Sequence, residues 1–285
     1  MPFMEVGVFV QTAEADSRRT FGVAEVTSQI VRAEDLGFDS AWVADHLFIE
    51  TPIGRYAGHD PMVHLAHAAA RTQRIRLGTL VACTAFRSAG QLAREAAALA
   101  DASRGRFILG VGAGWHKPEF DAFDYPFDQL VARFEEHLGA IKELLAGGRV
   151  TREGRYVKLR EAEVGPTASP PPLWVAGEGP RMIRLTARHA AGWNLAWGGL
   201  DPAWLAGPLA GLRRELEVAR RDRAGFTISA GFCWTPDQGT AALIGALRAY
   251  EAVGVDVAIL CLAEGPARPT APEYMNRAAE VLALQ

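Results

Sequence analysis

The sequence has few cysteines, few lysines and no long apolar segment, and each shortage excludes a class of protein. Its cysteines, Cys83, Cys233 and Cys261, lie far apart and form no CxxC pair, which argues against a disulfide-stabilised secreted protein and against a zinc site. No apolar run approaches the about 18 residues of a membrane-spanning helix. The first residues resemble a strand rather than a signal peptide. We therefore expect a cytoplasmic protein that does not enter a membrane.

Charge and motifs narrow the function further. The 285-residue chain has a formal net charge of −3, so a nucleic acid is not an expected partner. The only lysines are Lys117, Lys142 and Lys158, and Lys117 alone lies near the end of a predicted strand, which makes Schiff-base chemistry a poor option. A GxSxG elbow is missing, and nothing in the sequence demands a metal.

The organisation of the chain is an alternation of short apolar runs with amphipathic segments. We predict strands at 6–10, 40–44, 75–81, 107–111, 173–176, 193–197, 226–234 and 255–262. We predict helices at 21–36, 61–71, 91–102, 128–145, 181–190, 202–221, 237–253 and 271–284. A longer excursion covers 112–127, and a hairpin is expected at 149–159.

Strict alternation predicts parallel strands joined by crossover helices. Eight such units in 285 residues favour a closed (β/α)8 TIM barrel, with an open doubly wound sheet as the alternative. The one Pro-rich stretch, at 165–174, is too short to separate two domains. We therefore expect residues 1–285 to form a single α/β domain with loop insertions.

Active sites of such barrels follow the carboxyl ends of the strands. Asp45 and His46 end the second predicted strand, where a histidine can carry a proton or donate to a cofactor; the alternative is that they only cap the strand. The GVGAG run at 110–114 ends the fourth. Its spacing is not that of a dinucleotide fingerprint, so it indicates close backbone approach to something flat or bulky, or a flexible turn.

Two further groups of residues follow predicted strands. In the run Gly177, Glu178, Gly179, Pro180 and Arg181, a helix begins at a glycine-rich turn, which suits a phosphate but also suits a simple tight turn. Four side chains are expected to line an apolar pocket for a small-molecule substrate, namely Gln11, Trp115, Trp197 and Trp234. Trp193 also lies near a strand end, but core packing is the alternative for it, and Trp42 is expected in the core.

Four stretches together resemble the luciferase-like monooxygenases, and within that family the branch that uses the deazaflavin F420. They are LGFDSAWVADHL, RIRLGTLV, LAREAAALADASRGRFILGVGAGW with EF soon after, and PPPLWVAGEGPRMIRLTARHAAGWN. They occur in the family's order and cover roughly residues 5 to 200, whereas the last third matches in pattern only.

The resemblance implies a barrel that binds F420, or alternatively FMN, at its mouth, and that often forms a homodimer. It implies that Asp45 and His46 lie beside the deazaflavin ring, and we expect His46 to be the proton carrier or a polarising donor and Asp45 to position the ring or His46. A non-proline cis peptide is implied at Leu80-Val81, backing the ring. Phosphate contacts are implied at Gly177, Glu178, Gly179 and Pro180. From the residues themselves we also expect cofactor contacts at Gly112 and at Arg181, whose charge would favour the phosphate.

The sequence also departs from the pattern. Trp115 stands where F420 enzymes that oxidise glucose 6-phosphate have a glutamate acid, and the lysines for a sugar phosphate are missing, so we do not expect that substrate. Glu119 is the nearest carboxylate. The compact length favours F420 over FMN. The expected function is hydride transfer between F420 and an unidentified organic substrate; an FMNH2-dependent monooxygenase and a non-catalytic flavin or F420 carrier are the alternatives.

Overall fold

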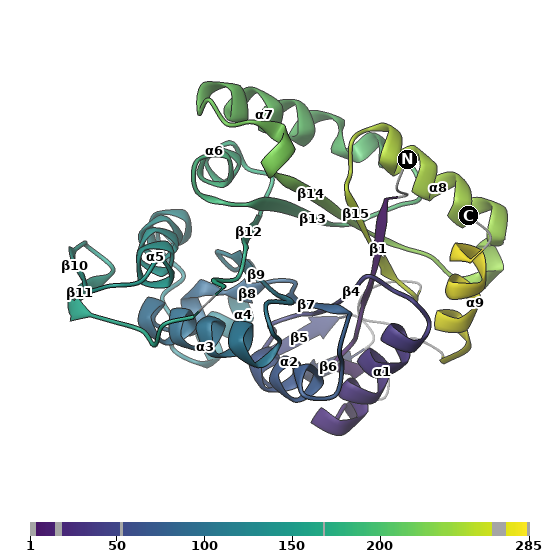
Figure 1. Ribbon diagram of the computed structural model, residues 1–285, viewed down its shortest axis with the longest axis horizontal. Helices are drawn as coiled ribbons and strands as arrows, with labels where there is room; N and C mark the ends of the chain where they lie inside the picture. Colours follow the sequence, from purple (N-terminus) through teal and green to yellow (C-terminus); the bar gives the residue numbers. More distant parts are fainter. Residues whose placement is uncertain (1–3, 15–18, 52–53, 168, 264–271, 284–285) are drawn as a thin grey trace.

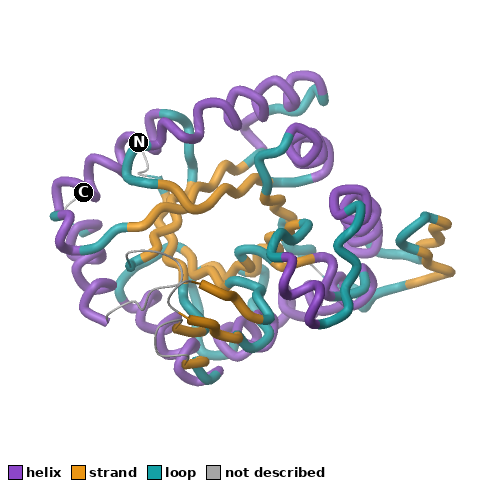
Figure 2. Tube along the Cα trace, turned by 180° about the vertical axis from the view of Figure 1, so that it is seen from behind, coloured by secondary structure: helices purple, strands orange, loops and turns teal. Residues whose placement is uncertain are grey.

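The computed structural model describes residues 4–14, 19–51, 54–167, 169–263 and 272–283. Figures 1 and 2 show a ring of strands surrounded by helices. The ring contains β1 (Glu5–Phe9), β4 (Ser40–Val43), β7 (Arg76–Thr79), β9 (Phe107–Gly112), β12 (Leu173–Ala176), β13 (Gly192–Gly198), β14 (Thr227–Cys233) and β15 (Val257–Cys261). All neighbours in it are parallel, and β12 pairs with β9 to close the ring. The predicted (β/α)8 barrel is thus confirmed and the open sheet is excluded.

The helices that cover the barrel are α1 (Val23–Asp35), α2 (Pro61–Ala69), α3 (Ala89–Ala102), α5 (Leu130–Leu145), α6 (Pro180–His189), α7 (Ala206–Val218), α8 (Thr240–Ala252) and α9 (Pro272–Leu282). Their starts follow local chemistry. Asp60 caps α2 by accepting from the amide of Met62, and Pro61 takes the first helical position. The predicted helices overlap these, although residues 271 and 284 of the last one lie outside the described residues. None of the described helices is long and apolar enough to cross a bilayer.

Short elements decorate the barrel. Three are antiparallel hairpins: β2 (Ala13–Glu14) with β3 (Arg19–Thr20), β5 (Phe48–Thr51) with β6 (Gly54–Ala57), and β10 (Val150–Glu153) with β11 (Lys158–Ala162). The others are the strand β8 (Ala82–Cys83) and the helix α4 (Lys117–Ala122). Four 3-10 turns complete the set: η1 (Thr84–Phe86), η2 (Pro202–Leu205), η3 (Arg223–Gly225) and η4 (Pro236–Gln238). The hairpin predicted at 149–159 corresponds to β10 and β11. The other two hairpins were not predicted, because strands of two to four residues carry too little periodicity.

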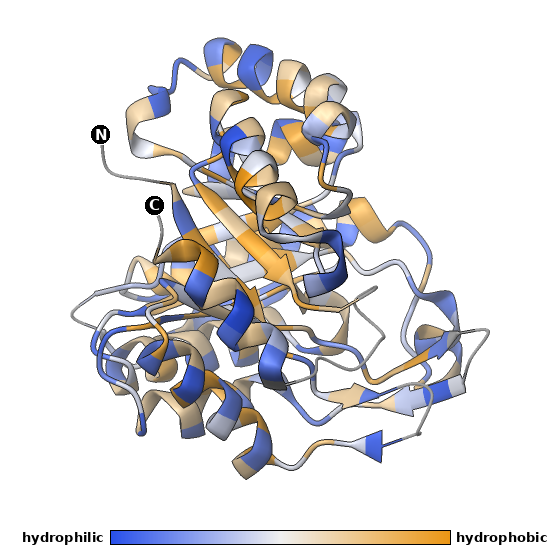
Figure 3. Cartoon of the chain, turned by 90° about the vertical axis from the view of Figure 1, so that its right-hand side faces the viewer, coloured by the Kyte–Doolittle hydropathy of each residue, from blue (hydrophilic) through white to orange (hydrophobic). Residues whose placement is uncertain are grey.

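The floor of the barrel is filled by two tryptophans. Trp42 and Trp174 stack inside it with ring centroids 5.2 Å apart. Glycines on neighbouring strands make room, since a Cβ at Gly192 would lie 2.7 Å from the Trp174 indole. Trp42 is therefore core, as predicted, and Trp193 packs in the layer between barrel and helices. Figure 3 shows the apolar strands inside and the more hydrophilic helix faces outside. A filled floor leaves the opposite end of the barrel for chemistry.

Two strands carry one extra residue each near that end. Leu77 pairs with Phe107 and Ala82 pairs with Val111, so an advance of five residues on this strand matches an advance of four on β9. Likewise Leu195 and Gly198 of β13 pair with Ala230 and Phe232, so an advance of three residues on β13 matches an advance of two on β14. Each bulge contains a non-proline cis peptide, Leu80-Val81 in the first and Ala196-Trp197 in the second. The first was predicted and is confirmed; the second was not predicted.

Candidate active site at the barrel mouth

Glu119 holds His46 at the mouth of the barrel. The Nδ1 atom of His46 lies 3.0 Å from Oε2 of Glu119. The other carboxylate oxygen accepts the backbone amides of Leu47 at 2.5 Å and Phe48 at 3.1 Å. Because a carboxylate only accepts, neutral His46 must carry its proton on Nδ1 and keep Nε2 as an acceptor. The pair therefore has the arrangement of a histidine held for proton transfer at one defined atom.

The position of Glu119 depends on a sharp turn before α4. Gly114 has φ +85°, and a Cβ there would lie 2.5 Å from the Phe120 ring, so only glycine lets α4 approach this closely. The Glu119 side chain is 2% exposed, while that of His46 is 23% exposed. From the sequence alone, Glu119 is only the carboxylate nearest to Trp115. The EF pair soon after the fourth predicted strand marks its position in the family pattern, but this pair does not indicate which residue Glu119 contacts.

Aromatic rings surround this pair. The Trp115 ring stands edge-on to His46 with centroids 5.7 Å apart, and Trp115 is 67% exposed. The His116 ring contacts both the Trp115 ring and the Phe48 ring. Burial, helped by the negative charge of Glu119, raises the pKa of Tyr56 to about 12, so this hydroxyl stays protonated. Trp115 therefore lies beside His46, and its role in a substrate pocket stays a prediction.

Asp45 belongs to a different set of contacts. Its Oδ2 accepts the Cys83 amide at 2.9 Å and Arg87 at 2.5 Å, and Arg87 reaches Oδ1 at 3.1 Å. Burial raises the pKa of Asp45, and the two hydrogen bonds from Arg87 oppose that effect by favouring the ionised form. All these contacts tie the segment after the first bulge to β4. Among the described residues these contacts join Asp45 to Cys83 and Arg87 rather than to the His46 ring, and its place beside the cofactor ring stays a prediction.

The glycines at 110 and 112 let the first bulge pack closely against β9. A Cβ at Gly112 would lie 2.7 Å from Cγ2 of Val81, and one at Gly110 would collide with the Thr79 carbonyl. The close approach that the sequence predicted is real, but its partner is the protein's own chain. Gly112 is buried under Val81, so it shapes the surface formed by Leu80 and Val81 rather than offering a surface of its own.

The glycine-rich turn leads into α6. Gly177 has φ +136°, Gly179 is the N-cap residue, and among the described side chains none caps this helix. Its first amide N–H groups therefore suit an anion such as a phosphate. The Arg181 guanidinium points elsewhere, because it pairs with Glu135 at 2.6 Å. The turn could hold a cofactor phosphate through backbone atoms, with Glu178 and Pro180 exposed beside it.

The remaining predicted pocket residues separate into two groups. Trp197 belongs to the inner cluster, with its ring 4.8 Å from that of Phe9, and Gln11 is buried just after β1. Trp234 is 1% exposed and packs in the outer core, where its indole donates to the Gly239 carbonyl at 3.3 Å. Trp234 was therefore placed wrongly at the mouth: its position in β14's alternation turns it toward the helices.

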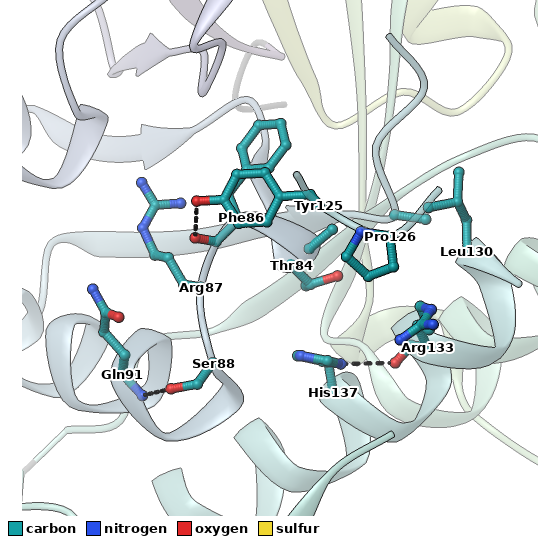
Figure 4. Close-up of a pocket in the computed structure, with 12 residues that line it drawn as sticks. Thr84, Phe86, Arg87, Ser88, Gln91, Tyr125, Pro126, Leu130, Arg133 and His137 are labelled. Carbon is teal, nitrogen blue, oxygen red and sulfur yellow. Dashed lines mark hydrogen bonds between the residues drawn. The ribbon is translucent and has the colours of Figure 1, made fainter. Parts of the chain in front are cut away.

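A cavity of about 300 Å³ lies beside this region, between η1, the start of α3 and α5 (Figure 4). Its walls are internally bonded: Ser88 caps α3 by accepting from Gln91, Tyr125 donates to the Phe86 carbonyl, and His137 bonds the Arg133 carbonyl. His46 and the glycine-rich turn do not line it. We therefore place the candidate active site at the mouth and not in this cavity.

Comparison with known proteins agrees with the resemblance. The profile of the luciferase-like monooxygenase family matches residues 4–281. An F420-dependent glucose-6-phosphate dehydrogenase from Nakamurella multipartita is 35% identical over 211 residues, covering 72% of this chain and 61% of its own. The matches span 54% of the length of two further relatives with the same name, so this chain aligns with only a part, about half to three fifths, of these proteins.

Solved structures share the fold at low identity. An F420-dependent secondary alcohol dehydrogenase in complex with an F420-acetone adduct has a TM-score of 0.83 at 17% identity, with 98% of both chains covered. A monooxygenase from Streptomyces bottropensis has a TM-score of 0.81 at 22% identity, covering 99% of this chain and 98% of its own. Such distant likeness shows the architecture alone, and it includes proteins of both chemistries considered above.

Proposed function

Since this chain belongs to the luciferase-like monooxygenase family, we propose that it is an F420-dependent oxidoreductase that transfers a hydride between the cofactor and a small organic substrate. The observation that carries the proposal is the His46–Glu119 pair, held just after β4 at the open end of a barrel whose floor is filled. When bound, F420 supplies the redox centre, a carbon that accepts or gives a hydride.

The residues present fit such a cofactor. The bulge at Leu80 and Val81 offers an apolar surface for one face of a flat ring, and the turn at Gly177 to Pro180 offers uncapped helix amides for the phosphate. His46 then exchanges a proton with the substrate oxygen through Nε2, while Glu119 keeps the proton of Nδ1 in place. Asp45 acts at a distance, by fixing the segment that follows the bulge.

The charges at the mouth favour an uncharged substrate, such as a carbonyl compound or the corresponding alcohol. Each described Arg or Lys in the loops after the barrel strands already pairs with a carboxylate: Arg19 with Glu25, Arg55 with Glu50, Arg87 with Asp45, Lys117 with Asp121, and Arg181 with Glu135. A substrate phosphate would have to compete with these carboxylates. We therefore propose a substrate different from the sugar phosphate in the relatives' name.

The first test is a fluorescence titration of the purified protein with F420 and, separately, with FMN. Micromolar or tighter binding of F420 with weaker FMN binding supports the proposal. Preferential FMN binding, with oxygen consumption when a flavin reductase is added, would replace it by a monooxygenase. Tight F420 binding without turnover of any carbonyl or alcohol would indicate a carrier, and binding of neither cofactor would refute a redox function.

The role of His46 is tested with the His46→Ala variant. Losing a positioned proton carrier should lower kcat by about 10²- to 10⁴-fold while the affinity for F420 stays within a few-fold. His59→Ala is the matched control, because His59 is an exposed histidine in the loop before α2. A His46→Ala enzyme that turns over normally would remove His46 from the mechanism.

We also propose a cytoplasmic homodimer made of one domain per chain. The resemblance supports the dimer, and the three free cysteines suit a reducing compartment. The single domain is supported by β1, which pairs with both β4 and β15 and so joins the two ends of the chain in one sheet. Light scattering should give twice the 30.7 kDa mass of the chain.

A further inference from the structure

Cys233 and Cys261 lie side by side at the rim of the barrel. Each is the last residue of its strand, β14 and β15 respectively, and the two are register partners. Neighbouring strands are about 4.8 Å apart, which falls within the Cα separations that disulfides span. The backbone therefore already holds the two residues at a distance from which they can be cross-linked.

The two side chains also point the same way. Phe232 and Leu260, the residues just before them, pack in the outer core against the helices. Because side chains alternate along a strand, Cys233 and Cys261 must face the barrel interior, where both contact the inner cluster. The Trp197 ring lies against Gly231, two residues before Cys233, so the pair borders the apolar side of the mouth.

The sulfur atoms interact with each other. A hydrogen bond from the Cys261 thiol lowers the pKa of Cys233, whereas the same bond and burial raise the pKa of Cys261. Cys233 is partly exposed. The third cysteine provides a contrast, because burial raises the pKa of Cys83 to about 12. Cys233 is thus more accessible than Cys83, its pKa is shifted in the opposite direction, and a second thiol lies beside it on the neighbouring strand.

We propose that Cys233 and Cys261 form a modification site, a dithiol at the barrel rim that a peroxide converts into an intramolecular disulfide. The Cys233 thiolate attacks hydrogen peroxide, so an S–O bond forms, the O–O bond breaks and hydroxide leaves. The Cys261 sulfur then attacks that sulfenic acid after giving up its proton, so the S–S bond forms and the S–O bond breaks with loss of water. Overall, two thiols and one peroxide give one disulfide and two waters.

The wild-type protein tests this directly. It is incubated with hydrogen peroxide at neutral pH, quenched, denatured and titrated for free thiols. We expect the count to fall from three to one. Trypsin cleaves after Arg248, which separates the two cysteines, so mass spectrometry should find their peptides joined until a reductant is added. A count that stays at three, or a disulfide that joins two chains, would overturn the proposal.

Two variants identify the thiols. In Cys261→Ser the second thiol is missing, so oxidation of Cys233 should stop at a sulfenic acid that dimedone traps. Cys83→Ser is the matched control, and its disulfide should form at the wild-type rate. A Cys83→Ser protein that no longer forms the disulfide would place the reaction elsewhere and would also overturn the proposal. None of these readouts requires F420 or turnover, so the outcome does not depend on the proposed function.

Discussion

Asp45 and His46 are adjacent in the chain, yet each belongs to a separate acid–base pair with a different surrounding. Asp45 pairs with Arg87, and the two side chains are 3% and 6% exposed. His46 pairs with Glu119, and its side chain is 23% exposed at the mouth. The side chains of successive residues at the end of a strand point in different directions. The difference shows that one pair is closed to solvent and holds the bulge, whereas the other keeps one atom available for chemistry.

The largest effect should come from breaking the closed pair. In Arg87→Met the Asp45 carboxylate would stay buried without its partner, and Asp60 would lose a contact of 2.6 Å. Removing one member of a buried ion pair typically costs about 3 to 5 kcal/mol. We expect a loss of that size in the free energy of unfolding at pH 7, measured by urea denaturation.

A second variant separates charge from packing. In the single variant the Asp45 carboxylate is left buried without a partner. Adding Asp45→Asn to Arg87→Met removes that buried charge, so part of the stability should return. A single variant within 1 kcal/mol of wild type would show that the pair does not hold the bulge segment, and the contrast with His46 would lose its basis.

Next in size is a pH effect that we expect from a buried histidine on the Asp45 side. His64 of α2 lies near His59 and Asp60; it is fully buried, and neither ring nitrogen has a hydrogen-bond partner among the described residues. Burial lowers the pKa of His64 to about 4. Because the folded pKa is below the ordinary value, its stability contribution is present above about pH 6.5 and is lost as the pH falls toward 4, by about 3 kcal/mol in all.

The His64→Leu variant isolates this contribution. It should be at least as stable as wild type at pH 7, since an unsatisfied polar ring is replaced by an apolar side chain. Unfolding curves at pH 7, 5.5 and 4 should show a smaller loss of stability in the variant than in wild type. Identical pH profiles would mean that His64 is protonated without cost and is less enclosed than the structure shows.

The open pair should respond in its chemistry rather than its stability. In Glu119→Gln the amide oxygen can still accept the amides of Leu47 and Phe48, but its NH2 group then faces His46 and needs an acceptor there. The imidazole proton should therefore move to Nε2, which nitrogen-15 NMR of the ring detects. We expect kcat to fall by about 10- to 100-fold, the usual effect of losing a group that orients a histidine. An unchanged tautomer together with an unchanged kcat would contradict the assigned role.

The same contrast explains what could be predicted from sequence. The barrel follows from local alternation, and the bulge at Leu80-Val81 follows from the family resemblance, carried there by the continuous stretch RIRLGTLV. Pairs such as His46 with Glu119 join residues 73 apart, and their geometry depends on the turn at Gly114 and on the angle of α4. Trp234 was placed wrongly because its position at a strand end was used without the alternation that decides which side a residue faces.

The smallest effect is expected at the exposed edge of the open pair. Trp115 is 67% exposed, so Trp115→Ala should leave the free energy of unfolding within about 0.5 kcal/mol of wild type. If its ring covers the substrate above His46, losing an aromatic contact of about 0.5 to 1.5 kcal/mol should raise KM by about two- to ten-fold for apolar carbonyl substrates, with a smaller change in kcat. Phe123→Ala is the matched control, because Phe123 is 53% exposed and contacts Phe48 and Tyr125 instead. Equal KM values in both variants would place the substrate away from Trp115, on the side of the mouth formed by Trp197 and the two cysteines.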